Sequence, residues 1–503
     1  MLKRVFMAPD PGRARLRFAA RGVLGIGLAV TGCGLAGHSL TGAVTGGLAA
    51  LLALFTVTDA TVRAQAVTTA LLPAVGLPVL AAAAELHDRP VARGLVLLAV
   101  VGAGVYARRW GPRGHSLGVF AFMTFFVAQF LHAGPEQLPE LYAAVLLSVL
   151  SASAVRFGLW CYERRTPPPP APVAPAGERG LARATTRQAV QATAAAAFAL
   201  VVGQLVSGDR WYWAVGATWW IFVNTTSRGE TLVRGFRRIL GTVLGIGLGL
   251  AVAVPVAGAP VPTAVLVAVC VFGIFYSAAV SYTWMMLSVT LLAELLYGLL
   301  GVLDPALLAV RFAETGVGAL GALLAVLFVL PITTHATTDA WIQRALRCVH
   351  ACTAEATARL AGAPGAAAST DPAARVAELE LLLGRVRLSV APLVHPLNPV
   401  RARKRRARRV LALLDDCAYE IHGLAAVTAG PDASRNLGLA AAFRRVETAV
   451  EALTEGRADT VTAPVDRPHA TEPALAHLHG LERALAEMAK PLRGPSGSPL
   501  VGA

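Results

Sequence analysis

Long apolar stretches, each near the length of a membrane-spanning helix, recur through the first two-thirds of this chain. A helix needs about 20 apolar residues to cross the hydrocarbon core of a bilayer. On that rule the sequence predicts twelve spans in two groups of six, near 20–36, 40–58, 66–84, 91–107, 115–132 and 140–161, and near 187–206, 209–225, 235–254, 261–280, 283–301 and 308–331. Charged residues make up only 15% of the chain, whereas soluble domains carry about 25%. We therefore expect an all-α polytopic membrane protein.

Basic residues indicate how the spans are oriented. Arginine is frequent before the first span and in alternate loops, at Arg13, Arg15, Arg17, Arg21, Arg108, Arg109, Arg113, Arg228, Arg234, Arg237 and Arg238. Loops rich in Lys and Arg stay on the cytoplasmic side of a membrane. The pattern predicts a multi-pass protein of the cell membrane with both termini in the cytoplasm. It also accounts for the net charge of +15 without a nucleic-acid partner.

Breaks in hydropathy predict five parts of the chain. The first transmembrane half covers 1–162, a Pro-rich cytoplasmic linker 163–183 and the second transmembrane half 184–334. A cytoplasmic helical domain is expected over 335–490, followed by a disordered tail over 491–503. Helical periodicity in that domain predicts helices over 335–360, 373–394, 401–429, 434–455 and 472–488.

The two transmembrane halves resemble each other at an offset of about 170 residues, at which Thr61 matches Thr231. Six spans followed by a cytoplasmic linker would give a parallel repeat, related by an axis along the membrane normal. Two differences separate the halves. Pro73 and Pro78 are expected to interrupt the third span of the first half, and a glycine stripe is present only in the second.

The stretch 211–249 carries the strongest sign of a binding site. Its aromatic apolar run ends at a polar break containing Asn224, and a new helix follows with Thr231, Arg234 and Arg238 in its first turns. A helix N-terminus and nearby arginines suit a carboxylate or phosphate. We expect Asn224, Thr231, Arg234, Arg238 and Thr290 to bind an anionic substrate. Alternatively, the arginines only satisfy the positive-inside rule and contact lipid phosphates.

Gly241, Gly245 and Gly249 continue the stripe of Arg234 and Arg238 on the same helix face. Small residues let another membrane helix approach closely. The stripe predicts a packing face, which could also serve dimerisation, and we expect a homo-oligomer.

Glu294 lies well inside the eleventh predicted span, on one stripe with Thr283, Leu287, Thr290 and Tyr297. A carboxylate at that depth costs about 3 kcal/mol on insertion scales, so it should face protein or water and often marks an ion path. We expect Glu294 to take part in proton coupling together with Glu314, near Arg311. The alternative is a structural ion pair between Glu294 and Arg311.

Other motifs carry less functional information. Seven of the nine residues from Arg401 to Arg409 are basic and could contact anionic lipid, although a solvated helix face is equally ordinary. Cys348 and Cys352 share a helix face and are interpreted as small core residues. Since no phosphate-binding loop, catalytic motif or paired zinc motif is present, we expect no enzyme activity, no cofactor and no metal site.

The second half resembles the fusaric acid resistance family, which is related to aromatic acid exporters and, more distantly, to plant aluminium-activated malate channels. The resemblance lies in Tyr212-Trp213-Ala214, Gly229-Glu230-Thr231 with Arg234, the run 238–245, residues 282–290, Arg311, and Gly316-Val317-Gly318 before Pro331. The first half resembles the family in hydropathy and in residues 59–63. Here a short Pro-rich linker replaces the large cytoplasmic insert between the halves.

The resemblance implies an inner-membrane efflux protein for aromatic or other organic acids, driven by the proton gradient. We therefore expect an exporter of organic anions. Two alternatives remain open at this stage: a passive organic-anion channel, and a membrane scaffold that acts through its C-terminal helical domain.

Overall fold

A computed structural model describes residues 13–163, 180–223, 225, 227–256, 259–331, 334–360, 372–394, 401–428, 437–455, 457–461 and 473–492. All regular elements in this part of the chain are helices. The described residues separate into two compact units. The membrane unit contains residues 13–163, 180–225 and 231–331, and the C-terminal unit contains 334–492 together with the short segment 227–230.

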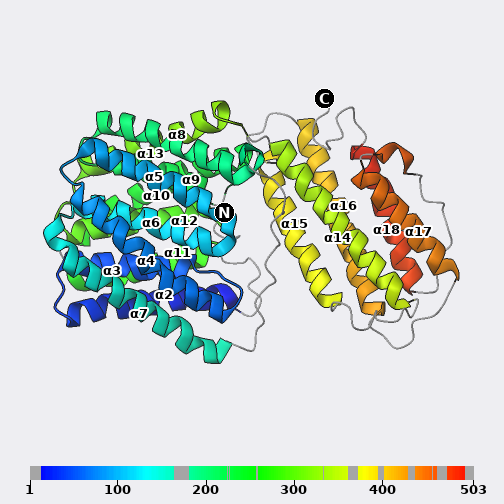
Figure 1. Cartoon of the computed structure of the whole chain (residues 1–503), viewed down its shortest axis with the longest axis horizontal. Coiled ribbons are helices and arrows are strands. Elements are labelled where there is room, and N and C mark those ends of the chain that lie inside the picture. Colours follow the sequence, from blue (N-terminus) through cyan, green and yellow to red (C-terminus); the bar gives the residue numbers. More distant parts are fainter. Residues whose placement is uncertain are drawn as a thin grey trace. The chain divides into compact units, whose positions relative to one another are not determined.

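Twelve α-helices, α2 to α13, lie between residues 13 and 331 of the described chain (Figure 1). The first six are α2 (Ala14–Leu35), α3 (Leu40–Thr56), α4 (Val62–Glu85), α5 (Pro90–Ala107), α6 (Gly111–Leu131) and α7 (Leu138–Glu163). The second six are α8 (Ala184–Val206), α9 (Tyr212–Phe222), α10 (Arg228–Val256), α11 (Pro260–Ser277), α12 (Tyr282–Leu299) and α13 (Pro305–Phe328).

Nine segments of the described chain are long and apolar enough to cross a membrane. One of them, Pro90–Leu131, contains both α5 and α6, which are separated by a single 3₁₀ turn at Arg108–Trp110. The predicted all-α polytopic membrane fold is confirmed. Two helices are shorter than a span: α3 has 17 residues and α9 has 11.

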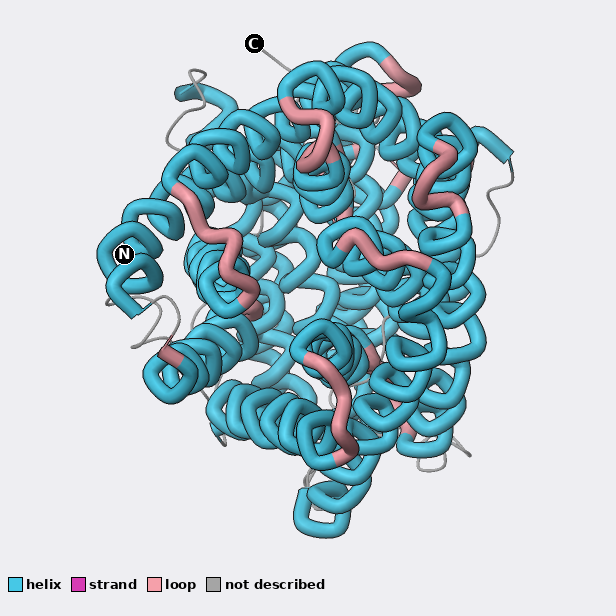
Figure 2. Tube along the Cα trace, turned by 90° about the vertical axis from the view of Figure 1, so that its left-hand side faces the viewer, coloured by secondary structure: helices cyan, strands magenta, loops and turns pink. Residues whose placement is uncertain are grey.

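The two sets of six helices share part of their pairing. In the first set α2, α3 and α7 pack together, and α6 contacts α4 and α5; in the second set α8, α9 and α13 pack together, and α12 contacts α11. Between the sets, α5 packs on α8 and α11 packs on α2. Figure 2 shows the helices of this unit from one end, joined by short loops. The contacts of α5 with α8 and of α11 with α2 thus join the two sets of helices.

Helix α4 passes through both of its prolines without a break, so the predicted interruption at Pro73 and Pro78 is wrong. Proline is tolerated inside membrane helices where neighbouring helices hold the segment in place. Between the two prolines, Gly76 of α4 packs directly against the Phe120 ring of α6. Close glycine packing is therefore not confined to the second set of helices.

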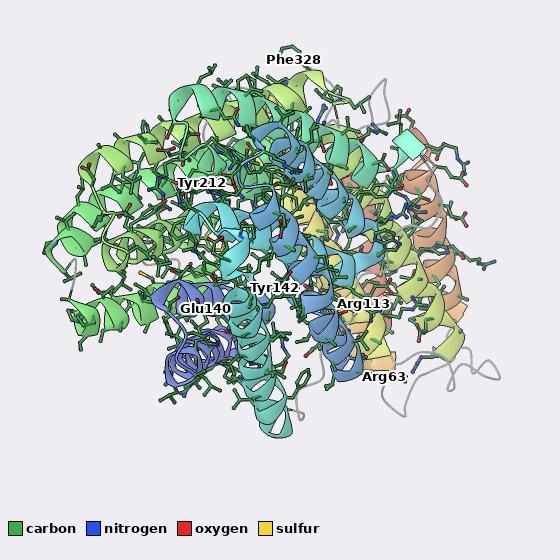
Figure 3. All side chains as sticks on the ribbon, turned by 60° about the vertical axis from the view of Figure 1, so that its left-hand side comes forward. Arg63, Arg113, Glu140, Tyr142, Tyr212 and Phe328 are labelled. Carbon is green, nitrogen blue, oxygen red and sulfur yellow. The ribbon has the colours of Figure 1, made fainter. Side chains whose placement is uncertain are left out.

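Polar side chains also hold α4 in place (Figure 3). Arg113 Nε donates a 3.2 Å hydrogen bond to the Thr68 hydroxyl, and the Tyr142 hydroxyl donates a 3.3 Å bond to the Leu77 carbonyl. Because backbone and side-chain polar groups find no water in the hydrocarbon region, these bonds fix α4 against α6 and α7.

The C-terminal unit is a bundle of α14 (Thr334–Leu360), α15 (Pro372–Val394), α16 (Arg401–Thr428), α17 (Leu437–Thr454) and α18 (Pro473–Leu492) around an apolar core (Figure 1). The predicted disordered tail begins at 491, but residues 491 and 492 are helical. Residues 493–503 and most of the predicted linker, 164–179, lie outside the described residues.

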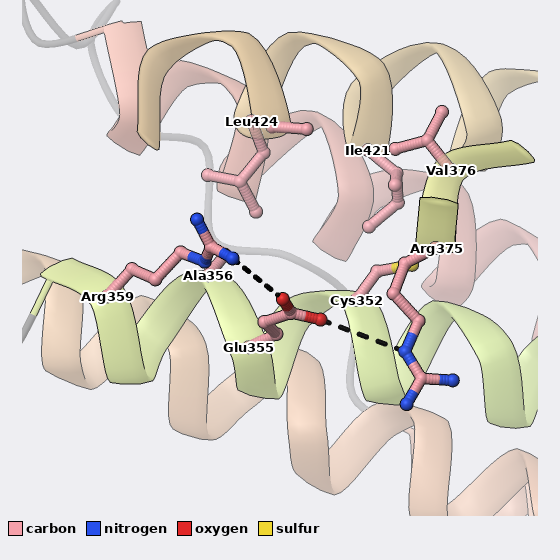
Figure 4. Close-up of a pocket in the computed structure, with 9 residues that line it drawn as sticks. Cys352, Glu355, Ala356, Arg359, Arg375, Val376, Ile421 and Leu424 are labelled. Carbon is pink, nitrogen blue, oxygen red and sulfur yellow. Dashed lines mark hydrogen bonds and ion pairs between the residues drawn. The ribbon is translucent and has the colours of Figure 1, made fainter. Parts of the chain in front are cut away.

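An ion pair joins two helices of this unit, α14 and α15. Glu355 of α14 forms ion pairs with Arg359 at 3.1 Å and with Arg375 of α15 at 3.8 Å (Figure 4). The cavity beside them is about 20 Å³, which is room for about one water molecule. The arrangement thus serves bundle packing rather than ligand binding.

Candidate functional site

The short helix α9 ends inside the membrane unit, and polar side chains from two other segments bind carbonyls at and just beyond its C-terminus. Arg108 donates to the carbonyls of Phe222 and Thr225, both at 3.3 Å, and Gln188 Nε2 donates to Thr225 at 2.7 Å. The last carbonyls of a helix have no partner within it, and an unpaired one is costly away from water. Arg108 and Gln188 make the early end of α9 possible.

Two residues before Phe222, the Trp220 carbonyl accepts two further bonds, from Arg234 Nε at 3.1 Å and from the Tyr282 hydroxyl at 3.0 Å. The Arg234 guanidinium also lies 4.0 Å from the centre of the Tyr282 ring. Arg234 therefore holds α9 and α12 at the start of α10. Its guanidinium is already engaged by the protein.

The other short helix, α3, ends in a comparable way with different residues. Arg156 of α7 is buried and donates to the carbonyls of Ala53, Leu54 and Val57, at 2.7, 3.1 and 3.0 Å. The Ser116 hydroxyl donates to Thr56 at 2.8 Å. Both sets of helices thus contain a short second helix whose C-terminus is closed by buried polar groups.

The predicted anion-binding residues do not form one cluster. Thr231 is buried, with its hydroxyl 3.3 Å from that of Thr225. Arg238, one helical turn beyond Arg234, is buried in the centre of the unit, where its Nη1 lies 2.9 Å from Met286 Sδ. Its Nε has no hydrogen-bond partner among the described residues. Asn224 lies outside the described residues.

Arg238 lines a central cavity of about 80 Å³ between the two sets of helices. Aromatic rings form much of its wall: Phe126 and Phe130 from α6, and Trp213 and Trp220 from α9. The ring centroids of Phe126 and Trp213 are 5.1 Å apart, at nearly right angles. A cationic group beside aromatic rings that meet edge to face suits a flat molecule that carries one negative charge.

A buried hydrogen-bonded group lies next to this cavity. Trp213 Nε1 donates a 2.7 Å bond to the Tyr297 hydroxyl, and the guanidinium of Arg311 lies 4.1 Å from the centre of the Trp213 ring. Arg311 Nη1 donates to the Thr290 carbonyl at 3.4 Å. Thr290 thus contacts the site through its backbone, and Arg311 joins α12 and α13 beneath the aromatic wall.

Glu294 of α12 has no exposed surface, and neither of its carboxylate oxygens has a hydrogen-bond partner in the described part of the chain. Its charge interacts electrostatically with Arg311, but no ion pair within 4.0 Å joins the two among the described residues. A fully buried charge normally requires a partner. Glu294 is therefore placed where its protonation state matters to the surrounding helices.

Glu314 is equally buried and also lacks a hydrogen-bond partner among the described residues. It lies against Gly203 of α8, where an added Cβ would approach its carboxylate to 2.9 Å. Arg311, one turn earlier on α13, interacts with Glu294 instead. The structure thus places two separate buried carboxylates, each against a glycine of a neighbouring helix.

Gly241, Gly245 and Gly249 let α10 approach α12. A Cβ at Gly241 would come within 2.7 Å of Met286, a Cβ at Gly245 within 2.5 Å of Thr290, and a Cβ at Gly249 would overlap Glu294. The stripe is covered by a helix of the same chain. An oligomer would need a different surface.

Sequence patterns did not point to Arg108, Phe126 or Phe130. Arg108 belongs to a basic loop and was interpreted only as a topology signal. The two phenylalanines lie in an apolar span of the first half, and nothing in their spacing distinguishes them from lipid-facing residues. The packing of α6 in the first set of helices against α9 in the second brings both rings to Trp213.

The comparisons with known proteins bear on the second half. Residues 195–325 match the model of the fusaric acid resistance protein-like family, which confirms the resemblance for that part of the chain. A search of curated proteins found no match. The matched segment contains Trp213, Arg238, Glu294, Arg311 and Glu314. Together with the apolar helices, the match supports a membrane transporter of the fusaric acid resistance type.

Proposed function

We propose that this membrane protein, similar over residues 195–325 to fusaric acid resistance proteins, exports organic acids, preferably aromatic carboxylic acids, from the cytoplasm. The observation that carries the proposal is the central cavity. It joins a wall of aromatic rings to the buried cation Arg238. An aromatic acid offers a flat apolar body and one carboxylate, which match those two features.

In this proposal Arg238 binds the substrate carboxylate, since its Nε lacks a hydrogen-bond partner within the described chain. The rings of Phe126, Trp213 and Trp220 contact the apolar body. Thr231 and Arg234 act at the end of α9 and the start of α10. Thr290 acts through its backbone carbonyl, which accepts from Arg311, and Asn224 remains a proposed contact at the polar break.

Proton coupling is assigned to Glu294, with Glu314 as a second carrier. Neutral and ionised forms of a buried carboxyl group differ strongly in energy, so protonation can drive a shift of the helices around it. Glu294 contacts α10 at Gly249, about three helical turns beyond Arg238 on the same helix. A change at Glu294 can therefore be transmitted to the substrate site through α10.

The test uses the full chain in proteoliposomes loaded with benzoate. An imposed proton gradient is expected to accelerate benzoate efflux by wild type, whereas Glu294→Gln should retain benzoate exchange and lose the dependence on the gradient. Arg238→Gln should lose both. Arg237→Gln is the matched control, since Arg237 is exposed on the same helix.

Three results would count against this assignment. Benzoate flux that follows only its own gradient, with no proton movement, indicates a passive channel. If the protein moves no benzoate, and its effect on the cell is lost when residues 335–503 are deleted, the protein acts as a scaffold. Unchanged gradient dependence in Glu294→Gln removes the proton role of that residue.

We further propose that the basic segment from Arg401 to Arg409 contacts anionic lipid. Arg405 and Arg408 are exposed on α16, whereas Ala407 is buried in the bundle and Arg409 forms an ion pair with Glu487. Each basic side chain near an anionic surface contributes about 1 kcal/mol. Replacing Arg405 and Arg408 by Gln should therefore weaken binding to phosphatidylserine vesicles.

A further inference from the structure

A second, larger cavity of about 320 Å³ lies between α2, α3, α11 and α12. Among the described residues that line it, Thr31 is the only one with a polar side chain, and none is charged. Its volume is within the range of about 300–1,000 Å³ typical of small-molecule sites. The proposed function above makes no use of this cavity.

The rim of this cavity is open to the surroundings of the helix bundle. Val30 and Leu40, both in its lining, are 42% and 45% exposed, and Ala264 on the facing helix is exposed as well. In a membrane protein, exposed apolar side chains on the outer face of the bundle contact lipid chains. The opening therefore faces the bilayer. Gly27 keeps the interior wide, because an added Cβ there would meet no atom within 4 Å.

The inner wall of the same cavity is also a wall of the central cavity. Leu48 of α3 and Leu292 and Leu296 of α12 line both cavities. Three leucine side chains thus separate a lipid-facing space from the space that contains Arg238. Rotation of these leucine side chains to other staggered rotamers would connect the two spaces.

We propose that the cavity between α2, α3, α11 and α12 is a lateral entrance, through which an amphipathic weak acid passes in its neutral form from the bilayer to the central cavity. Leu48, Leu292 and Leu296 are its gate. The uncharged lining requires the neutral form, because a carboxylate without a partner is costly to bury. The acid passes its proton to the buried carboxylate of Glu294, the proton carrier of the proposed function, and Arg238 then retains it as the carboxylate. This inference rests on the proposed function.

The experiment measures where a photoreactive acid reaches the protein. The full chain is reconstituted in liposomes, exposed to a trifluoromethyl-diazirinyl benzoic acid, illuminated, and mapped by mass spectrometry. Labelling is expected at Val267 and Leu299, which line only the lateral cavity, and at Phe126 and Trp220, which line only the central cavity. Both should increase as the pH falls and the neutral fraction of the acid rises.

Two variants obstruct the entrance without changing the central cavity. Ala268→Trp and Gly27→Phe each place a ring in the lateral space and should lower labelling of Phe126 and Trp220 about tenfold if they close the path. The matched control is Val269→Trp, one residue along the same helix, where the side chain is 60% exposed and outside the cavity lining. In the Val269→Trp variant, labelling of Phe126 and Trp220 should equal that of wild type.

The outcomes separate the entrance from the transport site. If Phe126 and Trp220 are labelled equally in wild type and in both filled variants, the lateral entrance is excluded and the central site stands. If the lateral cavity is labelled and excess benzoic acid does not compete, the cavity is a lipid cleft and the entrance is again excluded. If wild type shows no labelling at the central cavity, both the entrance and the proposed function fail.

Discussion

Gly249 of α10 and Glu294 of α12 occupy one space: the carboxylate of Glu294 lies where a side chain on Gly249 would begin. Every larger residue at 249 must therefore displace a fully buried carboxylate. The glycine determines where the carboxylate lies, and the carboxylate determines that the position remains glycine.

The variant Gly249→Ala is expected to destabilise the membrane unit by about 1–3 kcal/mol, as overpacked cores do. Gly247→Ala is the control, since a Cβ there meets no atom within 4 Å, and it should stabilise α10 by about 0.5–1 kcal/mol. Thermal unfolding in detergent measures both. Adding Glu294→Ala to Gly249→Ala should restore part of the lost stability; simple additivity of the two changes would show that the residues do not compete for space.

Removal of the Arg108 side chain should be costly although Arg108 lies beside a loop. Arg108→Ala leaves the carbonyls of Phe222 and Thr225 with fewer donors, at a cost of about 1–3 kcal/mol. Arg109→Ala should cost much less, because Arg109 is exposed and stacks on Trp110 at 4.2 Å. Equal melting temperatures for the two variants would mean that the end of α9 does not depend on Arg108.

The bond from Trp213 to Tyr297 should link the cavity wall to α12. Tyr297→Phe removes the acceptor of the buried Trp213 Nε1 group and should cost about 1–3 kcal/mol. Trp213→Phe removes the donor, and the double variant should be less destabilised than the two single changes combined. Chemical denaturation of the three variants gives the coupling energy, and a value of zero would indicate that the bond contributes nothing.

Thiol chemistry should distinguish two cysteines of the C-terminal unit. The hydrogen bond from Cys348 lowers the pKa of the Cys352 thiol, whereas burial raises the pKa of the Cys417 thiol. Because the thiolate is the reactive form, iodoacetamide should modify Cys352 before Cys417 in the folded protein at neutral pH. Cys348→Ala should slow the reaction of Cys352 at that pH; an unchanged rate would exclude the hydrogen bond as its cause.

The helices themselves were accessible from the sequence, because hydropathy reports directly on burial in lipid. The polar break after Val223 does mark the end of α9, although the helix has 11 residues and is shorter than the predicted span 209–225. Proline was misjudged in α4: Pro73 and Pro78 lie within a continuous helix, since packing on Gly76 and the bond to Leu77 outweigh local propensity.

The central site was less predictable than the helices. Its residues come from α3, α6, α9, α10 and α12, and periodicity along a single helix carries no information on which faces meet. Arg234 and Arg238 are four residues apart and were expected to act together. In the structure Arg234 caps α9, whereas Arg238 reaches the cavity.

The reciprocal contacts of α5 with α8 and of α11 with α2 predict how the two halves behave when they are expressed as separate polypeptides. Neither set of six helices covers its own edge, and the residues that close α3 and α9 differ, with Arg156 at one and Arg108 with Gln188 at the other. Expressed as two polypeptides divided after residue 163, the halves should complement each other as a heterodimer. Two copies of the same half lack these complementary edges, so a half expressed without the other should be degraded in the cell.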